Sequence, residues 1–281
     1  MTVVEHRLRI GAREVLLLEG PQGWGECSPL AGYPCDPGRA MASAIEAATL
    51  GWPTPRRAGI PVNALLAPGA TIDPVALGAF PAIKVKVGRD APAVDVERLR
   101  SLREAVGAGP ALRIDANGAW DVATAIEVLR ALAPLGLEFA EQPVAAMEDL
   151  ATVRRATGVP IAADECVRSV EDARRARRIG AADLLVLKVQ PLGGVRAALE
   201  VADASGLPAV VSSMLETSVG LAAGVALAAA LDDLPYACGL ATLAEIDGDV
   251  TDDPLVPVDG VLPVRAVVPT AAALVTYGAR S

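Results

Sequence analysis

The sequence predicts an α/β protein: a modified (β/α)8 barrel of the TIM type, with a small α+β domain capping one end. From residue 60 onward, short runs rich in β-branched residues alternate with longer amphipathic segments at a period of roughly 25 residues, as in a parallel barrel. A chain of 281 residues, 52% of them hydrophobic, is also long enough to bury such a core. A doubly wound sheet is the alternative, but the sequence lacks the glycine-rich phosphate turn that usually follows its first strand.

Each barrel unit is expected to contribute one short strand followed by one helix. The amphipathic segments 93–109, 121–136 and 169–182 are typical of the outer helices. The strand candidates, in chain order, are 60–67, 82–88, 111–118, 137–144, 159–166, 183–190, 207–214 and 235–242.

The first 59 residues differ in character from the repeating units. The runs RLRIG and EVLLLEG predict a hairpin, the Gly/Pro-rich segment 21–38 predicts a loop, and 39–51 predicts a helix. The tail from residue 250 predicts one more strand, in GVLPVRAVVP. We therefore expect a capping domain of residues 1–59, completed by 250–281, over a barrel of residues 60–249, with the Gly/Pro-rich loop as its mobile edge.

Charge and hydropathy exclude several classes of partner. A net charge of −9 argues against nucleic acid and against an anionic membrane surface. The longest apolar stretch, 219–231, is too short to cross a bilayer and predicts a buried helix. No signal-peptide pattern is evident at the N-terminus, which favours a cytoplasmic location. The expected partner is a small carboxylate substrate, and no protein partner is implied.

Cysteine and histidine usage excludes two further kinds of site. Cys27, Cys35, Cys166 and Cys238 show no CxxC spacing, which favours free thiols. His6 is the single histidine and lies in a predicted strand near the N-terminus, where a structural or exposed role is expected. A zinc cluster and a Ser–His or Cys–His triad are therefore excluded.

Lysine is confined to strand-like runs. Of 25 Lys and Arg residues only three are lysine, and two of them lie in AIKVKVG. Strand alternation puts Lys84 and Lys86 on one face and Ile83, Val85 and Val87 on the other. In a barrel the lysines would point inward, roughly 6.6 Å apart, with Lys86 nearer the C-terminal mouth where barrel enzymes react. Unlike arginine, lysine can lose its proton, which predicts an acid/base role; ion-paired structural lysines are the alternative.

Acidic residues end the next three strands, and a lysine ends the fourth. Asp115, Glu141, Asp164 and Lys188 follow Lys86 at separations of 29, 26, 23 and 24 residues. Their strand-end positions lie about 4.8 Å apart laterally. Three converging carboxylates need a cation, and oxygen-only ligands suit Mg²⁺, with Mn²⁺ as the alternative.

This arrangement predicts removal of a proton α to a substrate carboxylate. The metal would stabilise the enediolate that forms when the proton leaves. The base must be a lysine whose pKa falls from about 10.4 towards 7–8, a change of roughly 4 kcal/mol, and nearby positive charge from the metal and Lys84 favours such a fall. Lys188 faces the site from the opposite side as a second acid/base or a stabilising cation.

The ordered motifs KVKVG, DANGAW, EQP, DE and LKVQPLGG resemble the two-lysine branch of the enolase superfamily, over nearly the whole barrel. GWGECSPLAGY and SSMLETSVGLAAGVALAAAL further resemble the o-succinylbenzoate synthases of that branch. The resemblance implies dehydration of 2-succinyl-6-hydroxy-2,4-cyclohexadiene-1-carboxylate to o-succinylbenzoate in menaquinone synthesis. Lys86 would remove the proton and return it to the leaving hydroxyl, Lys188 would stabilise the enediolate, and Lys84 would tune Lys86.

Two details bear on the substrate. Dipeptide epimerases of the branch carry an acidic pair near the eighth strand, where this chain reads CGLATL, which favours an uncharged ring as the ligand. Ser212 and Ser213 end the seventh predicted strand and are expected either to bind a substrate carboxylate or to cap a helix. The capping domain is short for the superfamily.

Three alternatives stay open at this point. Racemisation of N-succinylamino acids, or another epimerase or cycloisomerase reaction of the branch, would use the same residues. A Schiff-base aldolase would use Lys188 but leave the three carboxylates without a purpose. A non-catalytic ligand-binding barrel would not be expected to retain lysines in a chain otherwise dominated by arginine.

Overall fold

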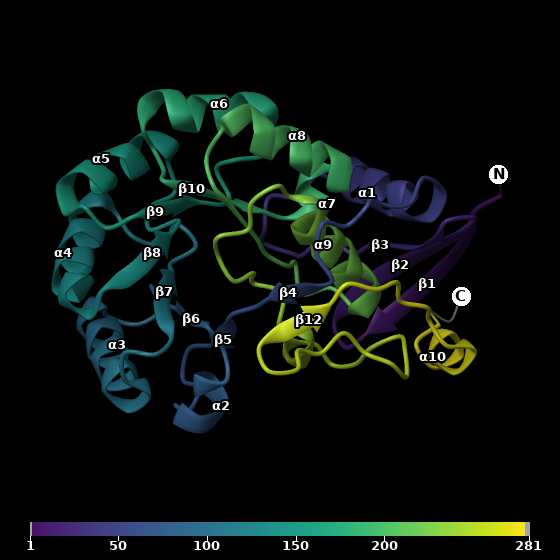
Figure 1. The fold of residues 1–281 in the computed structure, drawn as a ribbon, viewed down its shortest axis with the longest axis horizontal. Helices are drawn as coiled ribbons and strands as arrows, with labels where there is room; N and C mark the ends of the chain where they lie inside the picture. The colour runs from purple at the N-terminus through teal and green to yellow at the C-terminus, as the bar shows by residue number, and fades with distance from the viewer. Residues whose placement is uncertain (1, 279–281) are drawn as a thin grey trace.

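A parallel sheet of seven strands, curled into an open barrel, forms the centre of the molecule (Figure 1). The computed structural model describes residues 2–278. The strands follow one another in the sheet in chain order: β5 (Ala64–Leu66), β6 (Ala82–Lys86), β7 (Ala111–Asp115), β8 (Leu137–Glu141), β9 (Ile161–Ala163), β10 (Leu184–Leu187) and β11 (Ala209–Val211). The predicted barrel is confirmed.

Helices alternate with these strands and cover the outside of the sheet (Figure 1). The longer ones are α3 (Pro92–Val106), α4 (Val122–Leu132), α5 (Met147–Thr157), α6 (Val170–Ile179), α8 (Val195–Ser205) and α9 (Ser218–Ala230). The short ones are α2 (Pro74–Gly78), η1 (Ala133–Leu135), α7 (Val189–Leu192) and η2 (Leu243–Glu245).

The segment predicted as the eighth strand, 235–242, forms no strand in the structure. It still bridges the gap in the barrel, because Cys238 N–H donates to Pro61 O, shortly before β5, at 2.7 Å, and Gly239 N–H donates to Val211 O of β11 at 2.8 Å. The chain touches each edge at a single bridge, Val62 with Cys238 and Ser212 with Gly239, which is too short a ladder to count as a strand.

Side chains alternate between the inside of the barrel and its helical shell. In β6, Ile83 and Val85 join the large core between sheet and helices, while the lysines point inward, as predicted. Below the lysines a small apolar plug fills the barrel, built from Phe139, Ala162, Leu184, Val186 and Val210. Arg113 is buried beside this plug, with its guanidinium carbon 4.6 Å from the centre of the Phe139 ring.

A three-stranded antiparallel sheet and one helix form the cap. β1 (Val4–Ile10) and β2 (Arg13–Gly20) are the predicted hairpin, and α1 (Pro37–Thr49) is the predicted helix. The structure corrects the loop prediction for 21–38, because β3 (Gly23–Cys27) extends the hairpin. Glycine is typical of turns, which is why the sequence predicts a loop here. In the structure Gly25 is required where β3 meets α1, and Gly23 has a φ of 134°.

The tail of the chain returns to both parts of the molecule. β12 (Val261–Pro263) is the strand predicted in this region and pairs antiparallel with β4 (Gly59–Pro61). α10 (Ala271–Thr276) was not predicted, and after it Tyr277 O accepts a hydrogen bond from Arg9 N–H of β1 at 2.8 Å. Both termini of the described chain therefore lie beside the cap sheet (Figure 1).

The remaining sequence expectations concern helix α9, the cysteines and His6. All thirteen residues of α9 are buried, as predicted for 219–231. Among residues 2–278, no helix is both long enough and apolar enough to span a bilayer. The four cysteines are free thiols. His6 lies in β1, 3.2 Å from a carboxylate oxygen of Glu19 and against the ring of Trp24.

We predict that Gly25→Ala destabilises the protein by about 2 kcal/mol or more, because a Cβ there would lie 2.0 Å from the carbonyl oxygen of Ala44 in α1. Urea denaturation gives the measurement. Gly109→Ala is the matched control, since a Cβ at Gly109 meets no atom within 4 Å. Equal stability of the two variants would contradict the close approach of β3 to α1.

Candidate active site

A cavity of about 530 Å³ lies at the C-terminal ends of the barrel strands. Residues 30–33 of the cap cover it, and residues 212–215, after β11, form one wall. All three lysines of the chain, Lys84, Lys86 and Lys188, line it. The cap, the lysine strands and the loop after β11 thus meet around one space.

Strand register brings the polar residues together. Lys86 pairs in register with Asp115, and Asp115 with Glu141, across three adjacent parallel strands. Asp164 and Lys188 each follow directly after the next two strands, β9 and β10. Since each strand contributes its last or next residue, the side chains meet at one end of the barrel.

Each lysine is paired with a carboxylate. Lys84 Nζ lies 3.2 Å and 3.1 Å from the two carboxylate oxygens of Glu141 and 3.2 Å from Asp115 Oδ2. Lys86 Nζ donates to the same Asp115 oxygen at 2.7 Å, and Lys188 Nζ donates to Asp164 Oδ2 at 2.5 Å. The side chain of Lys86 is 28% exposed, against 9% and 8% for Lys84 and Lys188, so Lys86 is the most accessible to a substrate.

Burial and charge oppose each other in this cluster. Burial disfavours the ammonium form of Lys84, but the carboxylates of Glu141 and Asp115 outweigh this effect and raise the pKa of Lys84. Burial likewise disfavours the ionised form of Asp115, but Lys84 and Lys86 outweigh it and lower the pKa of Asp115. For Glu141 the balance is reversed: burial and the neighbouring charge of Asp115 raise its pKa to about 8 despite the contact with Lys84. Glu141 is therefore the acid of this cluster whose charge is least stabilised by its surroundings.

This donor set fits a hard divalent cation. Asp115, Glu141 and Asp164 offer only oxygen atoms, they are 1–2% exposed, and the raised pKa of Glu141 marks a need for positive charge. Within residues 2–278 no three potential ligands converge tightly enough to grip an ion as they stand. The lysine ammonium groups lie among the carboxylates, so metal binding must rearrange these ion pairs.

Tyr33 is a site residue that no sequence pattern predicted. Its hydroxyl donates to Asp164 Oδ1 at 2.7 Å, and its ring centre lies 4.1 Å from Lys188 Nζ. Tyr33 ends the GWGECSPLAGY motif, but nothing in its local sequence indicates that the loop reaches across to the residues after β9 and β10.

Asn117, in DANGAW, and Glu165, in DE, also belong to the site, although the sequence pattern predicted no role for either. Asn117 Oδ1 accepts from Lys86 Nζ at 2.8 Å, while Asn117 Nδ2 donates to Glu165 Oε1 at 2.8 Å. The other carboxylate oxygen of Glu165 is buried without a hydrogen-bond partner. Asn117 has a φ of 47°, a left-handed backbone uncommon outside glycine, and such strain is frequent at functional sites.

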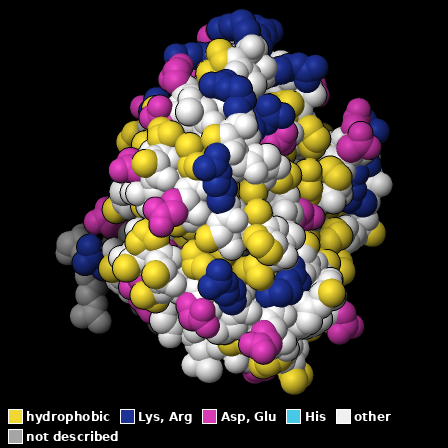
Figure 2. All heavy atoms as spheres, turned by 90° about the vertical axis from the view of Figure 1, so that its left-hand side faces the viewer, with side chains coloured by type: hydrophobic (Ala, Val, Ile, Leu, Met, Phe, Trp, Pro, Cys, Tyr) yellow, Lys and Arg dark blue, Asp and Glu magenta, His cyan; other side chains and the backbone are white. Residues whose placement is uncertain are grey.

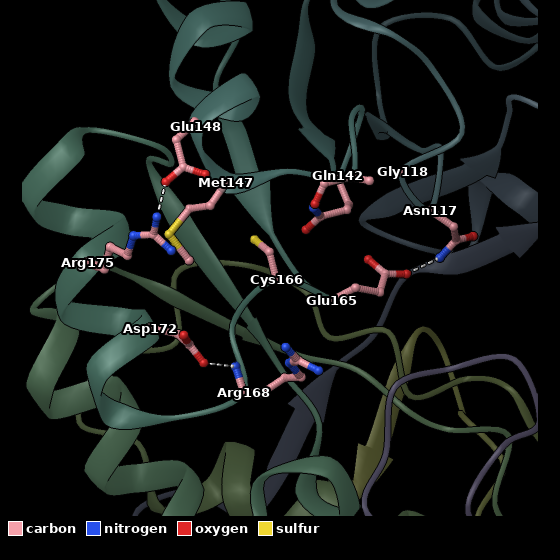
Figure 3. Close-up of a pocket in the computed structure, with 11 residues that line it drawn as sticks. Asn117, Gly118, Gln142, Met147, Glu148, Glu165, Cys166, Arg168, Asp172 and Arg175 are labelled. Carbon is pink, nitrogen blue, oxygen red and sulfur yellow. Dashed lines mark hydrogen bonds and ion pairs between the residues drawn. The ribbon is translucent and has the colours of Figure 1, made fainter.

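Behind these two residues lies a second pocket of about 360 Å³, shown in Figure 3. Asn117 and Glu165 line both this pocket and the main cavity. The Asn117–Glu165 pair therefore borders both spaces.

Ser212 and Ser213 line the main cavity, as expected for substrate contacts. The helix-capping alternative is wrong, because the side chain that caps α9 is Thr217. Ser213 Oγ lies 2.7 Å from Thr242 Oγ1, and Ser212 Oγ lies 3.4 Å from Gly239 O.

Comparison with known proteins agrees with this geometry. Residues 71–270 match the enolase C-terminal domain-like family, and residues 4–48 match the enolase N-terminal domain-like family. The chain is 55% identical over 259 residues to an o-succinylbenzoate synthase of Thermobifida fusca, covering 90% of this chain and 82% of that protein. It is 45% identical over 278 residues to the o-succinylbenzoate synthase of Mycobacterium bovis, covering 96% and 84%.

Solved structures agree on the fold. The muconate cycloisomerase of Pseudomonas fluorescens superposes with a TM-score of 0.84 at 23% identity, over 99% of this chain and 98% of that one. The muconate lactonizing enzyme of Klebsiella pneumoniae gives a TM-score of 0.85 at 22% identity, over 99% and 98%. The chain belongs to the enolase superfamily, and within it to the o-succinylbenzoate synthase family.

Proposed function

We propose that this protein is an o-succinylbenzoate synthase, a lyase that dehydrates 2-succinyl-6-hydroxy-2,4-cyclohexadiene-1-carboxylate to o-succinylbenzoate in menaquinone synthesis. One observation carries the proposal: every lysine of the chain meets a buried carboxylate at one mouth of the barrel. The relatives at 45% and 55% identity bear the name of this activity over most of the chain. Residues 1–59 with 250–281 would serve as the cap, and 60–249 as the catalytic barrel.

Enzymes of this family depend on a divalent metal, and we assign Mg²⁺ to Asp115, Glu141 and Asp164. When bound, the ion would stabilise the negative charge that develops on the substrate carboxylate as the neighbouring proton leaves. The three acids supply the charge and the oxygen atoms for this role.

Lys86 is assigned as the base. Its ammonium is the most exposed of the three, and Asp115 and Asn117 hold it at the edge of the cavity. Once neutral, its amine would take the ring proton α to the carboxylate. It would then return that proton to the departing hydroxyl as the C–O bond breaks, so that water leaves and the ring becomes aromatic.

Lys84 and Lys188 are assigned to supporting roles as cations. Lys84 shares Asp115 Oδ2 with Lys86, so it is the cation placed to act on Lys86 through their common carboxylate. Lys188 lies beside Asp164 and against the Tyr33 ring. There it would stabilise the anion that forms after proton removal. Ser212 and Ser213 are assigned to binding a carboxylate of the substrate.

We predict that Lys86→Arg lowers metal-dependent o-succinylbenzoate formation by at least about 10³-fold, because arginine keeps its proton at any working pH. The measurement is product formation by the wild type and the variant, with Mg²⁺ and with EDTA. Circular dichroism and Mg²⁺ binding of the variant provide the control. Wild-type protein that racemises N-succinylamino acids but leaves the cyclohexadiene untouched would overturn the assignment.

Metal affinity is expected to rise with pH and to level off above pH 8. The pKa of Glu141 is raised to about 8 by burial and by Asp115, so below that pH an incoming ion must displace a proton. Affinity should therefore approach a loss of about tenfold per pH unit below 8. Calorimetry of Mg²⁺ binding in two buffers of different protonation heat measures the proton released. Equal affinity at pH 6 and pH 8 would contradict the raised pKa.

A further inference from the structure

A second cluster of buried polar side chains lies between the cap and the barrel, outside the residues assigned to the reaction. We call it the polar seam. It consists of Arg13, Glu26, Ser28, Gln190, Glu216 and Thr217. Glu26, Gln190, Glu216 and Thr217 are at most 4% exposed.

Glu26, at the end of β3, is the acceptor at the centre of the seam. Its Oε1 accepts from Ser28 Oγ at 2.5 Å and from Thr217 N–H at 3.3 Å. Its Oε2 accepts from Thr217 Oγ1 at 2.5 Å and from Gly220 N–H at 2.9 Å. One carboxylate of the cap thus receives four donors, three of them from the first turn of α9 in the barrel.

Gln190 and Glu216 extend the seam towards the cavity. Gln190, two residues after Lys188, accepts from Ser28 N–H at 2.8 Å and donates to Glu216 Oε1 at 3.3 Å. Glu216 Oε2 accepts from Met214 N–H at 2.5 Å. The seam therefore joins the turn after Lys188 to two chain segments that contribute residues to the cavity wall, the cap loop and the loop 212–217.

The loop 212–217 needs such support. Leu215 has a φ of 59°, in the left-handed region that a branched side chain rarely adopts. From the cap, Arg13 Nη1 donates to Met214 O at 3.0 Å, and Arg13 Nη2 donates to Ser28 O at 2.5 Å. The same arginine thus holds the start of the cap loop and the strained wall of the cavity.

Burying the carboxyl groups of Glu26 and Glu216 in the seam costs free energy of folding. Burial raises the pKa of Glu26, and burial together with Glu26 raises the pKa of Glu216 to about 7. An apolar contact would join the cap to the barrel at lower cost. Hydrogen bonds are directional, so the seam supplies what an apolar contact lacks: a fixed relative position for the loops it joins.

We propose that Glu26 is a positioning residue, which acts through Thr217 and Gln190 to fix the cap loop and the loop 212–217 around the substrate. The kinetic test of this inference rests on the proposed function, because it measures KM and kcat of the dehydration. Its effect falls on substrate binding, because the hydrogen bonds of the seam go to the cap loop, to the turn after Lys188 and to the loop 212–217, and not to the side chains of the lysines and acids that act in the reaction. Loss of Glu26 should raise KM and leave kcat nearly unchanged.

Glu26→Gln is the first test. The amide nitrogen of glutamine would face a backbone N–H whichever way it turned, that of Thr217 or that of Gly220. We expect KM to rise about tenfold with kcat within about threefold of wild type, the loss typical of a hydrogen bond to a charged group. Amide hydrogen exchange, followed by mass spectrometry, should be faster in 28–36 and 212–217.

Thr217→Val and Thr217→Ser form a matched pair that tests the same contact with little change of shape. Valine removes the hydroxyl that donates to Glu26, whereas serine retains it. We expect KM to rise in Thr217→Val and to return towards the wild-type value in Thr217→Ser. This pair decides the question if Glu26→Gln does not fold.

Glu46→Gln is the control for docking of the cap in general. Glu46 of α1 pairs with Arg196 of α8, with Glu46 Oε1 and Arg196 Nη1 2.6 Å apart, and neither residue lines the cavity. An equal rise of KM in Glu46→Gln, or an unchanged KM in both Glu26→Gln and Thr217→Val, would overturn the proposal. If wild-type protein shows no dehydration, the proposed function fails alone, and hydrogen exchange in the two loops still decides the role of Glu26.

Discussion

The neutralisation of three buried carboxylates by the lysines is the constraint on which the rest of the structure depends. Asp115, Glu141 and Asp164 lie deep enough that each needs a cation within contact distance. Parallel strands provide this, because their C-terminal ends meet at one edge in register. The apolar plug below the site and the cap above it then keep these charges away from water, which strengthens each ion pair.

The cap meets the barrel through both close packing and directed polar contacts. Helix α9 is buried on every side because the barrel lies on one side of it and β3 on the other. Its alanine and glycine side chains allow the two layers to approach closely. At its N-terminus the packing gives way to the polar seam, where Glu26 takes the donors of the first helical turn. The cavity thus depends on a contact that lies outside it.

The sequence predicted the barrel and the charged cluster because both follow from local patterns. A strand shows as a β-branched run, and the position of Asp115 or Glu141 at its end follows from counting residues. Features made by distant contacts could not be predicted in this way. Segment 235–242 closes the barrel with single bridges, Tyr33 reaches Asp164 from the cap, and Thr217 caps α9 in place of the nearby serines. For the closing segment and for Tyr33 the partner lies far along the chain, whereas Thr217 caps α9 through the nearby Val219 N–H.

The confinement of lysine to the active site has a consequence for chemical labelling. In residues 2–278 every lysine lines the cavity, and two of the three side chains are less than 10% exposed. The remaining Lys and Arg positions of the chain are all arginine, and Figure 2 shows basic side chains spread over one face of the molecule. Reagents that acylate lysine amines would therefore find their lysine targets only inside the cavity. Modification of this protein by such a reagent would measure how far the cap admits solvent, and a bound carboxylate should protect against it.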